Sequence, residues 1–181
     1  MQIILRDEAT LAANDHARIQ ALLVVAFPQH AEIFAANSYW GSLPEYRLWL
    51  EDDDGTILAH AEFGRRLIHV GDYQTFIAGI GAVATHPEWQ RRGLGRTLFT
   101  QLQAALRSRI PVDFGFLECR DEVVEFYEKA GFTHMQRVVR CFEPDERIWV
   151  DCRGNQLVLP ATRTIDEWPV GDLIDLRGMP W

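Results

Sequence analysis

The chain has 181 residues, of which 48% are hydrophobic and 24% are charged. This is the composition of one globular domain, and it excludes a disordered chain, a collagen-like repeat and a disulfide-dense scaffold. Acidic residues outnumber basic ones by 26 to 18, so the formal net charge is −8. Such a surface repels nucleic acid and favours cationic partners, unless a local basic patch reverses the sign.

The basic residues gather in one segment. Between residues 86 and 109, five arginines face a single acid, Glu88, whereas the rest of the chain is strongly acidic. We therefore expect an anionic ligand at this segment and a cationic ligand elsewhere. The alternative is a solvated helix face that binds nothing.

The three cysteines, Cys119, Cys141 and Cys152, form no C-x-x-C pair. An odd number of isolated cysteines argues against a disulfide framework and predicts a reducing compartment. The chain starts without the apolar run of a signal peptide, and its longest apolar stretch, residues 21–27, is far below the roughly 18 residues that span a membrane. We expect a cytoplasmic protein without a membrane segment or a metal site.

In the first half of the chain, apolar residues change from period two to helical spacing and back, which predicts a strand, two helices and an antiparallel meander. Gly55, in the first turn of the meander, suits a positive φ angle, and Gly71 and Asp72 join the last two strands. The expected ranges in chain order are 2–6 for the first strand, 14–27 and 31–36 for the helices, and 46–50, 56–70 and 73–84 for the remaining strands.

The second half begins with an amphipathic helix of about four turns that starts at Leu94 and ends near Pro111. Gly131 closes a second helix in the position that favours left-handed geometry. The remaining ranges are 112–119 for a buried strand, 122–130 for the second helix, 132–142 for a strand, and 147–152 with 156–160 for a final hairpin. No repeat, low-complexity tract or linker divides the chain, so we expect one domain over residues 1–181.

The most informative stretch is residues 83–97, VATHPEWQRRGLGRT, where a strand ends, a loop turns and a helix begins. The first turn of a helix offers backbone N–H groups and the positive end of the helix dipole to an anion. Gly93 and Gly95 let phosphate oxygens approach the backbone, and Arg91, Arg92 and Arg96 can add charge-assisted hydrogen bonds. The dinucleotide fingerprint fails because Leu98 stands where a third glycine is needed, and the nucleotide-triphosphate loop lacks its lysine.

Two motifs then resemble the GNAT acyltransferases (Gcn5-related N-acetyltransferases). Residues 90–95, QRRGLG, match the Q/R-x-x-G-x-G/A motif of that family, and residues 126–132, FYEKAGF, match its L/F-Y-x-x-x-G-F motif. The motifs occur in the family's order, and the expected strands and helices agree over residues 1–145. The resemblance implies the GNAT fold: a mixed α/β (α+β), mostly antiparallel twisted sheet of about six to seven strands, flanked by about four helices, with a C-terminal hairpin and tail.

The resemblance also implies how the donor, acetyl-CoA or another acyl-CoA, is bound. The diphosphate of coenzyme A would lie on the backbone amides from residue 91 to residue 97, and the pantetheine arm and thioester would run beside the strand end. The implied cofactor-binding residues are Val83, Ala84, Thr85, Arg91, Arg92, Gly93, Leu94, Gly95, Arg96 and Thr97.

A narrower resemblance covers three further segments. Residues 40–47, WGSLPEYR, residues 65–71, RRLIHVG, and residues 167–175, EWPVGDLID, are similar to the rhizobial nodulation N-acyltransferases, which transfer a fatty acyl chain to the amine of a chitin oligosaccharide. The W-x-x-G-D part also looks like the tail of the aminoglycoside 2′-N-acetyltransferases, whose acidic groups hold the aminosugar. Because the chain keeps Arg91, Arg92 and Tyr127, a coenzyme A thioester is the expected donor.

The expected acceptor-binding residues are Trp40, Trp168 and Asp172, with the tail over residues 161–181 packed near the acceptor site. Aromatic faces pack against sugar rings or cations, and carboxylates pair with ammonium groups. The alternative for the two tryptophans is that they are core aromatics which hold the ends of the chain in place.

Tyr127 and Glu118 are the expected catalytic residues. By resemblance, Tyr127 donates a proton to the departing thiolate; the alternative is that it only packs on a helical face shared with Val123 and Ala130. Residues 117–120, LECR, resemble the L-E-V-R strand end of the ribosomal-protein acetyltransferases, in which the glutamate is the base. For Glu118 the alternative is a salt bridge with Arg120 or Arg140.

Two weaker candidates for the base are Glu62 and His86. Glu62 can equally face solvent on its strand, and His86 can equally shape the turn before Pro87. Attack by the amine creates an oxyanion, which the backbone N–H of Val83 stabilises if the strand is bulged there.

We therefore expect an N-acetyltransferase that moves an acetyl or short acyl group from coenzyme A to a primary amine of a small cationic acceptor, such as an aminosugar or aminoglycoside. One alternative is a long-chain N-acyltransferase of the nodulation type, and another is a non-catalytic module that senses acyl-CoA. No nucleic-acid or membrane partner is expected, and a homodimer is left open.

Overall fold

The computed structural model describes all 181 residues, which form two compact units. The first unit comprises Met1–Gly64, Ile80–Leu102 and Trp181, and the second comprises Arg65–Gly79 and Gln103–Pro180. Strands β3 (Ile57–Val70) and β4 (Tyr73–Thr85) and helix α3 (Leu94–Ser108) each have residues in both units. A single domain over residues 1–181 stays a prediction.

The first unit is built on three antiparallel strands. Strand β1 (Gln2–Asp7) pairs with β2 (Tyr46–Glu51), and β2 pairs with β3. In this register Arg47 lies opposite Glu62 and Trp49 lies opposite His60. Because opposite residues of a strand pair project from the same face, these four side chains share one face of the sheet.

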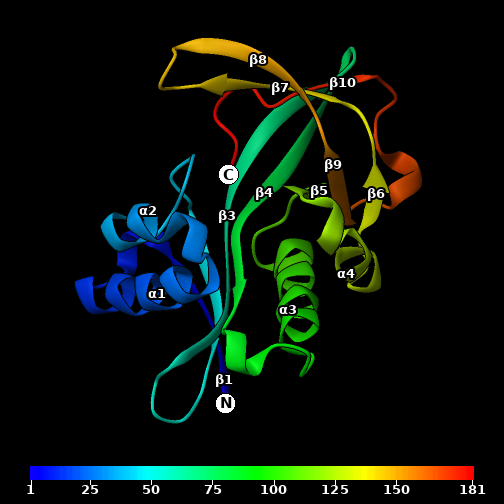
Figure 1. Cartoon of the computed structure of the whole chain (residues 1–181). Helices are drawn as coiled ribbons and strands as arrows, with labels where there is room; N and C mark the ends of the chain where they lie inside the picture. The colour runs from blue at the N-terminus through cyan, green and yellow to red at the C-terminus, as the bar shows by residue number, and fades with distance from the viewer. The chain divides into compact units, whose positions relative to one another are not determined.

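Helices α1 (Ala13–Ala26) and α2 (Ala31–Ala36) lie side by side in the first unit (Figure 1). The amide of Ala12 donates to Asp15 at 3.0 Å at the start of α1, and Pro28, which opens the next short helix, follows its end. Both helices pack on the sheet face described above. The buried residues of this core are Ile19, Leu22, Leu23, Phe34, Trp49, Ile57 and Ala84.

The strands of the second unit are hydrogen-bonded in the order β6-β9-β5-β4-β3-β10-β7-β8. The pairs β4 with β5 and β10 with β7 are parallel. The pairs β10 with β3, β5 with β9, β6 with β9 and β7 with β8 are antiparallel. Besides parts of β3 and β4, this unit contains the strands β5 (Phe114–Cys119), β6 (Thr133–Met135), β7 (Val138–Glu143), β8 (Ile148–Arg153), β9 (Asn155–Pro160) and β10 (Leu173–Asp175).

The fourth α-helix, α4 (Val124–Lys129), is short, and Gly131 after it has φ +98°. The other helical segments are single 3₁₀ turns. These are η1 (Glu8–Thr10), η2 (Pro28–His30), η3 (Pro87–Trp89), η4 (Asp121–Val123) and η5 (Ile165–Glu167).

The mixed, mostly antiparallel sheet with four helices is confirmed, but it holds ten strands, more than the expected number. Two further expectations are wrong. The strand expected over residues 132–142 is two strands, since β6 pairs with β9 whereas β7 pairs with β8 and β10. The final hairpin does not exist, because β8 pairs with β7 and β9 pairs with β5 and β6. Local periodicity identifies a strand but not its partner, which the rest of the sheet decides.

The tail adds a strand to the second unit. Ile174 of β10 lies opposite Val70 of β3 on one side and Val139 of β7 on the other. Its side chain is fully buried. The three residues of β10 therefore join two parts of the sheet that would otherwise end in open edges.

No single helix is both long and apolar enough to cross a membrane. One pair of helices, Ala13–Ala26 and Pro28–Ala36, reaches the required length and composition when both are counted together, but the pair is bent by 117°.

Candidate functional site

The loop before α3 has the backbone geometry of an open anion site. Arg91 has φ 60° and Gly93 has φ 81°, so two residues of this short loop lie in the left-handed region. A Cβ placed on Gly93 would meet no protein atom within 4 Å. The space above this glycine is therefore available to a ligand atom that approaches the backbone.

Helix α3 begins directly after this space. The amide of Thr97 donates to the carbonyl oxygen of Gly93 at 3.0 Å, which closes the first helical turn. The amides of Gly93, Leu94 and Gly95 precede that bond and have no carbonyl one turn earlier to receive them. Of the expected run of amides from residue 91 to residue 97, the last one is thus already engaged within the helix.

The arginines surround this helix start. Arg91, Arg92 and Arg96 are all exposed, as a solvent-borne anion requires. The guanidinium of Arg92 lies 4.6 Å from the centre of the Trp89 ring. An arginine that lies over an aromatic face leaves its N–H groups available for an anion.

Strand β4 is irregular just before Val83, as the expected oxyanion site requires. Ala82 has φ 43°, a conformation that costs a residue with a side chain about 1–2 kcal/mol. The Nδ1 atom of His60 lies 2.9 Å from the carbonyl oxygen of Ala82, within hydrogen-bond distance. A carbonyl can only accept, so Nδ1 carries the proton and His60 is the donor.

His60 is fully buried, and its Nε2 has no hydrogen-bond partner. Burial lowers the pKa of His60 to about 3, and the charge of Arg47 acts in the same direction. The ring is therefore neutral at physiological pH, and its role is to hold the irregular part of β4.

A buried ion cluster lies on the same sheet face. Arg47 has no exposed surface and donates to Glu8 through Nε at 2.6 Å and through Nη2 at 3.1 Å. Its Nη1 donates to Glu62 Oε2 at 2.6 Å and to the carbonyl oxygen of Ser38 at 2.6 Å, and its Nη2 reaches Ser38 Oγ at 3.1 Å. One guanidinium thus serves two carboxylates.

Glu62 is 1% exposed, so the expectation that it can face solvent is wrong. Its Oε1 is buried without a hydrogen-bond partner. Burial raises the pKa of Glu62 to about 8. The positive charge of Arg47 and a hydrogen bond from the Trp40 backbone act to lower this pKa, while the negative charge of Glu8 acts to raise it. A carboxyl group with a pKa near neutrality can exchange a proton under physiological conditions.

Tyr127 lies on α4 in the second unit, where it is buried between aromatic rings. Its ring centroid is 5.1 Å from that of Phe126 and 5.4 Å from that of Phe132, and its carbonyl accepts from the Phe132 amide at 3.1 Å. Burial raises the pKa of Tyr127, and Cys119 acts in the same direction. The phenol therefore stays protonated over the working pH range, as a proton donor requires, while its ring packs against two neighbouring aromatic rings.

Glu118 lies at the end of β5 in the second unit. Its Oε1 accepts from Gln156 Nε2 at 3.1 Å. Burial of the carboxyl raises its pKa, partly opposed by this hydrogen bond. The alternative pairing with Arg140 is wrong, because Arg140 instead binds Asp151 through two hydrogen bonds at 2.7 and 2.8 Å.

The expected acceptor residues lie in different surroundings. Trp40, in the first unit, is 49% exposed, and its ring is 4.5 Å from that of His30. Trp168, in the second unit, packs its ring on Phe114 at 5.0 Å and on Phe116 at 6.4 Å. This packing is what the core-aromatic alternative describes for Trp168.

The side chain of Asp172 is fully exposed and lies 3.4 Å from Arg137. An exposed pair of this kind is worth little, so the carboxylate can exchange its partner for an ammonium group. No group of three His, Cys, Asp or Glu side chains is placed to hold a metal ion, and all three cysteines are free thiols.

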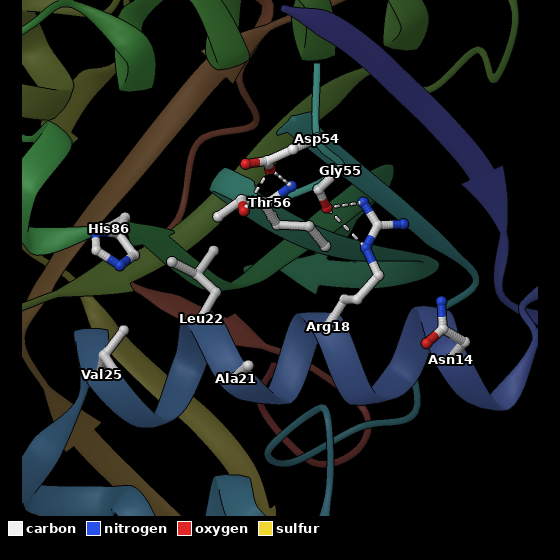
Figure 2. Close-up of a pocket in the computed structure, with 10 residues that line it drawn as sticks. Asn14, Arg18, Ala21, Leu22, Val25, Asp54, Gly55, Thr56 and His86 are labelled. Carbon is white, nitrogen blue, oxygen red and sulfur yellow. Dashed lines mark hydrogen bonds between the residues drawn. The ribbon is translucent and has the colours of Figure 1, made fainter. Parts of the chain in front are cut away.

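A cavity of about 660 Å³ opens between α1 and the turn that joins β2 to β3 (Figure 2). Arg18 extends from α1 toward the turn and donates through Nε to the carbonyl oxygen of Gly55 at 2.9 Å. His86, the other weak candidate for the base, also lines this cavity, and its Nδ1 is buried without a partner.

Sequence reasoning missed Arg47, Glu8 and the supporting role of His60. The available signal was an arginine inside an apolar strand, residues 46–50, because a buried arginine needs carboxylate partners. The positive φ of Ala82 left no signal, since alanine is not a residue that favours it. Trp181 was also missed: its main-chain carbon would lie 2.7 Å from a Cβ placed on Gly81.

Comparison with solved structures supports the GNAT fold. A GNAT family N-acetyltransferase (YhbS) from Escherichia coli, in complex with CoA, superposes with a TM-score of 0.60 at 17% identity, over 97% of this chain and 90% of that one. The ribosomal-protein-S18-alanine N-acetyltransferase from Escherichia coli superposes with a TM-score of 0.52 at 22% identity, over 93% of this chain and 100% of that one. These likenesses show the fold alone.

Sequence comparison shows the family. Nodulation protein A (NodA) matches over residues 1–180. Nodulation protein A from Mesorhizobium japonicum is 31% identical over 150 residues, which cover 78% of this chain and 76% of the relative. The same protein from Bradyrhizobium sp. (strain NC92) is 27% identical over 188 residues, which cover 96% of this chain and 88% of the relative. The chain therefore belongs to the Nodulation protein A family, whose sequence here adopts the GNAT fold.

Proposed function

We propose that the protein is an acyl-CoA-dependent N-acyltransferase that acts on a primary amine of a small cationic acceptor. The observation that carries this proposal is the start of α3, where open space above Gly93 meets unengaged helix amides and three exposed arginines. A diphosphate fits this site because it needs several N–H donors, positive charge and close backbone approach. The acidic remainder of the chain suits a cationic acceptor.

The residues supply the steps that acyl transfer needs. An alkyl amine with a pKa of about 10 costs about 4 kcal/mol to deprotonate at pH 7, and a positioned base recovers part of that cost. The amide of Val83, which follows the irregular Ala82, is the proposed donor to the oxyanion. Tyr127 is the proposed donor to the departing thiolate, and Glu118 is the base that the resemblance suggests.

The length of the acyl chain has two candidates. Arg91, Arg92 and Tyr127 favour a short acyl group carried by coenzyme A, and an aminosugar or aminoglycoside as acceptor. Membership in the Nodulation protein A family favours a long acyl chain transferred to the amine of a chitin-type oligosaccharide.

We propose that the enzyme works in the cytoplasm. The free cysteines are typical of a reducing compartment, and so is a donor whose transfer releases a free thiol.

The test is calorimetric titration with coenzyme A, followed by assays of thiol release. Acetyl-, octanoyl- and palmitoyl-CoA are each combined with glucosamine, a partly deacetylated chitin tetramer and kanamycin. Uptake of coenzyme A with thiol release for one pair supports the transferase and identifies the chain length. Uptake of coenzyme A without thiol release across the panel would favour the sensor, and no uptake would overturn the proposal.

A further inference from the structure

The carboxyl group of Glu62 lies in the first unit and has no role in the reaction steps proposed above. It is 1% exposed, and its Oε2 accepts from Arg47 at 2.6 Å. Its Oε1 is buried and makes no hydrogen bond. A carboxylate that served only to neutralise Arg47 would be expected to use both oxygens, since a buried acceptor without a donor is costly.

Arg47 does not need Glu62 for charge balance. Glu8 accepts from both Nε and Nη2 of the same guanidinium, at 2.6 and 3.1 Å, which is the two-point geometry that best satisfies an arginine. Glu62 is thus a second carboxylate beside one positive charge. The proton that this cluster most readily takes up therefore belongs on Glu62.

The unused oxygen faces the irregular part of β4. Oε1 would lie 3.2 Å from a Cβ placed on Gly81, which is the residue directly before Ala82. Any side chain at position 81 would meet Glu62 and Trp181, so only glycine keeps this approach open. His60, two residues before Glu62 on the same sheet face, holds the carbonyl of Ala82 at 2.9 Å. The carboxyl and the backbone that we assign to the thioester are therefore neighbours in one unit.

The surroundings suit a proton acceptor that works near neutral pH. Trp181 lies against Gly81 on the side of Oε1, because a Cβ placed on Gly81 would meet both residues. The groups that act on the pKa of Glu62 are Arg47 on β2, Glu8 on η1 and the Trp40 backbone, which donates a hydrogen bond. His60 lies two residues away on the same sheet face and is neutral, and the main-chain carboxyl carbon of Trp181 lies 2.7 Å from the point that Oε1 approaches, a Cβ placed on Gly81. The segment of β4 that faces it, Gly81 and Ala82, contributes no charge.

We propose that Glu62 is the general base of the transfer reaction, a proposal that rests on the acyltransferase function argued above. The Glu62 carboxylate takes one proton from the acceptor ammonium, directly or through one water, and becomes a carboxylic acid. The amine nitrogen then forms a bond to the thioester carbonyl carbon, and the carbon–sulfur bond breaks. The thiolate takes a proton from Tyr127, and the second amine proton restores the phenol, so that the products are an amide and a free thiol. Glu62 later returns its proton to solvent.

The first test compares Glu62→Gln with wild type on two acceptors that differ in basicity. A base is needed for an alkyl amine, which is protonated at pH 7, but hardly for an aniline, which is already neutral. We expect a loss of about 10²-fold or more in kcat with the alkyl amine and less than about tenfold with the aniline. Equal losses for the two acceptors would overturn the proposal, as would an unchanged kcat for the alkyl amine.

Glu8→Gln is the matched control, because Glu8 binds the same guanidinium but does not face Gly81. Glu8→Gln removes a negative charge beside Glu62 and therefore lowers the pKa of Glu62. The rising limb of the kcat–pH profile, over which the base loses its proton, should move to lower pH while turnover is retained. A purely structural ion cluster would not move that limb. This variant also keeps the proposal testable if Glu62→Gln does not fold, since an unmoved limb contradicts it.

Two further measurements separate this proposal from the others. Infrared difference spectra of the free protein should show a protonated carboxyl that titrates near neutral pH and is missing in Glu62→Gln. Coenzyme A affinity, measured by calorimetry, should be the same for wild type and Glu62→Gln. If wild type does not bind coenzyme A, the acyltransferase function itself fails. If it binds and Glu118→Gln, rather than Glu62→Gln, removes the rising limb, the assignment of Glu62 alone fails.

Discussion

The side chain of His60 holds the backbone of Ala82: its Nδ1–H donates to the Ala82 carbonyl at 2.9 Å across two neighbouring strands. Ala82 has φ 43°, so this hydrogen bond stabilises a conformation that alanine does not favour by itself. The amide of the next residue, Val83, is the proposed donor to the oxyanion. A histidine that takes no part in proton transfer thus supports the geometry of the reaction.

Replacement of His60 tests that support. His60→Leu leaves the Ala82 carbonyl without its donor, which should lower the free energy of unfolding by about 1–3 kcal/mol. It should also reduce kcat with little change in coenzyme A affinity, because the loop at Gly93 is untouched. His60→Gln retains an N–H donor and should recover part of both losses. Urea denaturation and thiol release measure the two effects, and equal kcat values for the Leu variant and wild type would count against the role.

Protonation of Glu62 and His60 should affect stability in opposite directions. The folded-state pKa of Glu62 is raised to about 8, so its contribution to stability is complete below its ordinary pKa of 4.5 and is lost as pH rises toward 8. The folded-state pKa of His60 is lowered to about 3, so its contribution is present above 6.5 and is lost as pH falls toward 3. Between pH 4.5 and 6.5 the loss at Glu62 and the gain at His60 offset each other as pH rises, so the free energy of unfolding should be greatest over that range.

Variants show which residue causes the loss of stability at high pH and which causes the loss at low pH. Urea unfolding at a series of pH values should show that Glu62→Gln removes the loss of stability between about pH 5 and 8. The matched variant His60→Gln should flatten the acid limb instead. When the folded and unfolded pKa values of a group differ by one, the free energy of unfolding changes by about 1.4 kcal/mol, which such curves resolve well. A Glu62→Gln profile that parallels wild type above about pH 5 would show that the carboxyl is not perturbed.

Gly93 should be intolerant of a side chain, although no protein atom stands in the way. Its φ is 81°, so Gly93→Ala costs about 1–2 kcal/mol of backbone strain, and Gly93→Val costs more because a β-branched residue fits this region least. The new side chain would also occupy the space assigned to the diphosphate. We expect calorimetric coenzyme A affinity to fall at least tenfold in Gly93→Ala and to be lost in Gly93→Val.

The control for this loop is Arg92→Lys, which keeps the charge but loses the planar group that stacks on Trp89. It should weaken coenzyme A binding less than Gly93→Val does and in a salt-dependent way. If Gly93→Val binds coenzyme A as tightly as wild type, the diphosphate does not lie at the start of α3.

Tyr127→Phe removes one hydroxyl and leaves the aromatic packing on Phe126 and Phe132 intact. If the hydroxyl donates to the departing thiolate, kcat should fall by about 10²-fold or more while coenzyme A affinity is unchanged. The loss should be smaller with a donor whose thiol is more acidic, such as a thiophenyl ester, because that leaving group needs the proton less. Full turnover by Tyr127→Phe would leave the residue with a packing role only.

The sequence was sufficient for elements whose pattern is local. The helix that starts at Leu94 and the positive φ of Gly131 follow from periodicity and from glycine chemistry, and the structure confirms both. It was not sufficient for strand partners. Residues 156–160 are nearly continuous apolar residues, which fit a buried strand between any two neighbours, and they pair with β5 and β6 rather than with the strand that precedes them in the chain.

The candidate site was predictable to a similar extent. The loop at Gly93 could be found because glycines, arginines and a helix start coincide in one short segment. Glu62 could not be assigned, because polar residues at positions 60 and 62 of an apolar strand look like the solvent-facing side of a sheet. That face is instead covered by α1 and α2, and only the buried Arg47 on the opposite strand makes a carboxylate tolerable there.

The short strand β10 has a consequence for handling the protein. Ile174 fills the gap between β3 and β7, so a break in the chain before Leu173 would leave backbone donors and acceptors of Val70 and Val139 exposed at once. Two such open edges invite pairing between molecules. Proteolysis of the tail should therefore show itself first as aggregation, before any loss of helical signal.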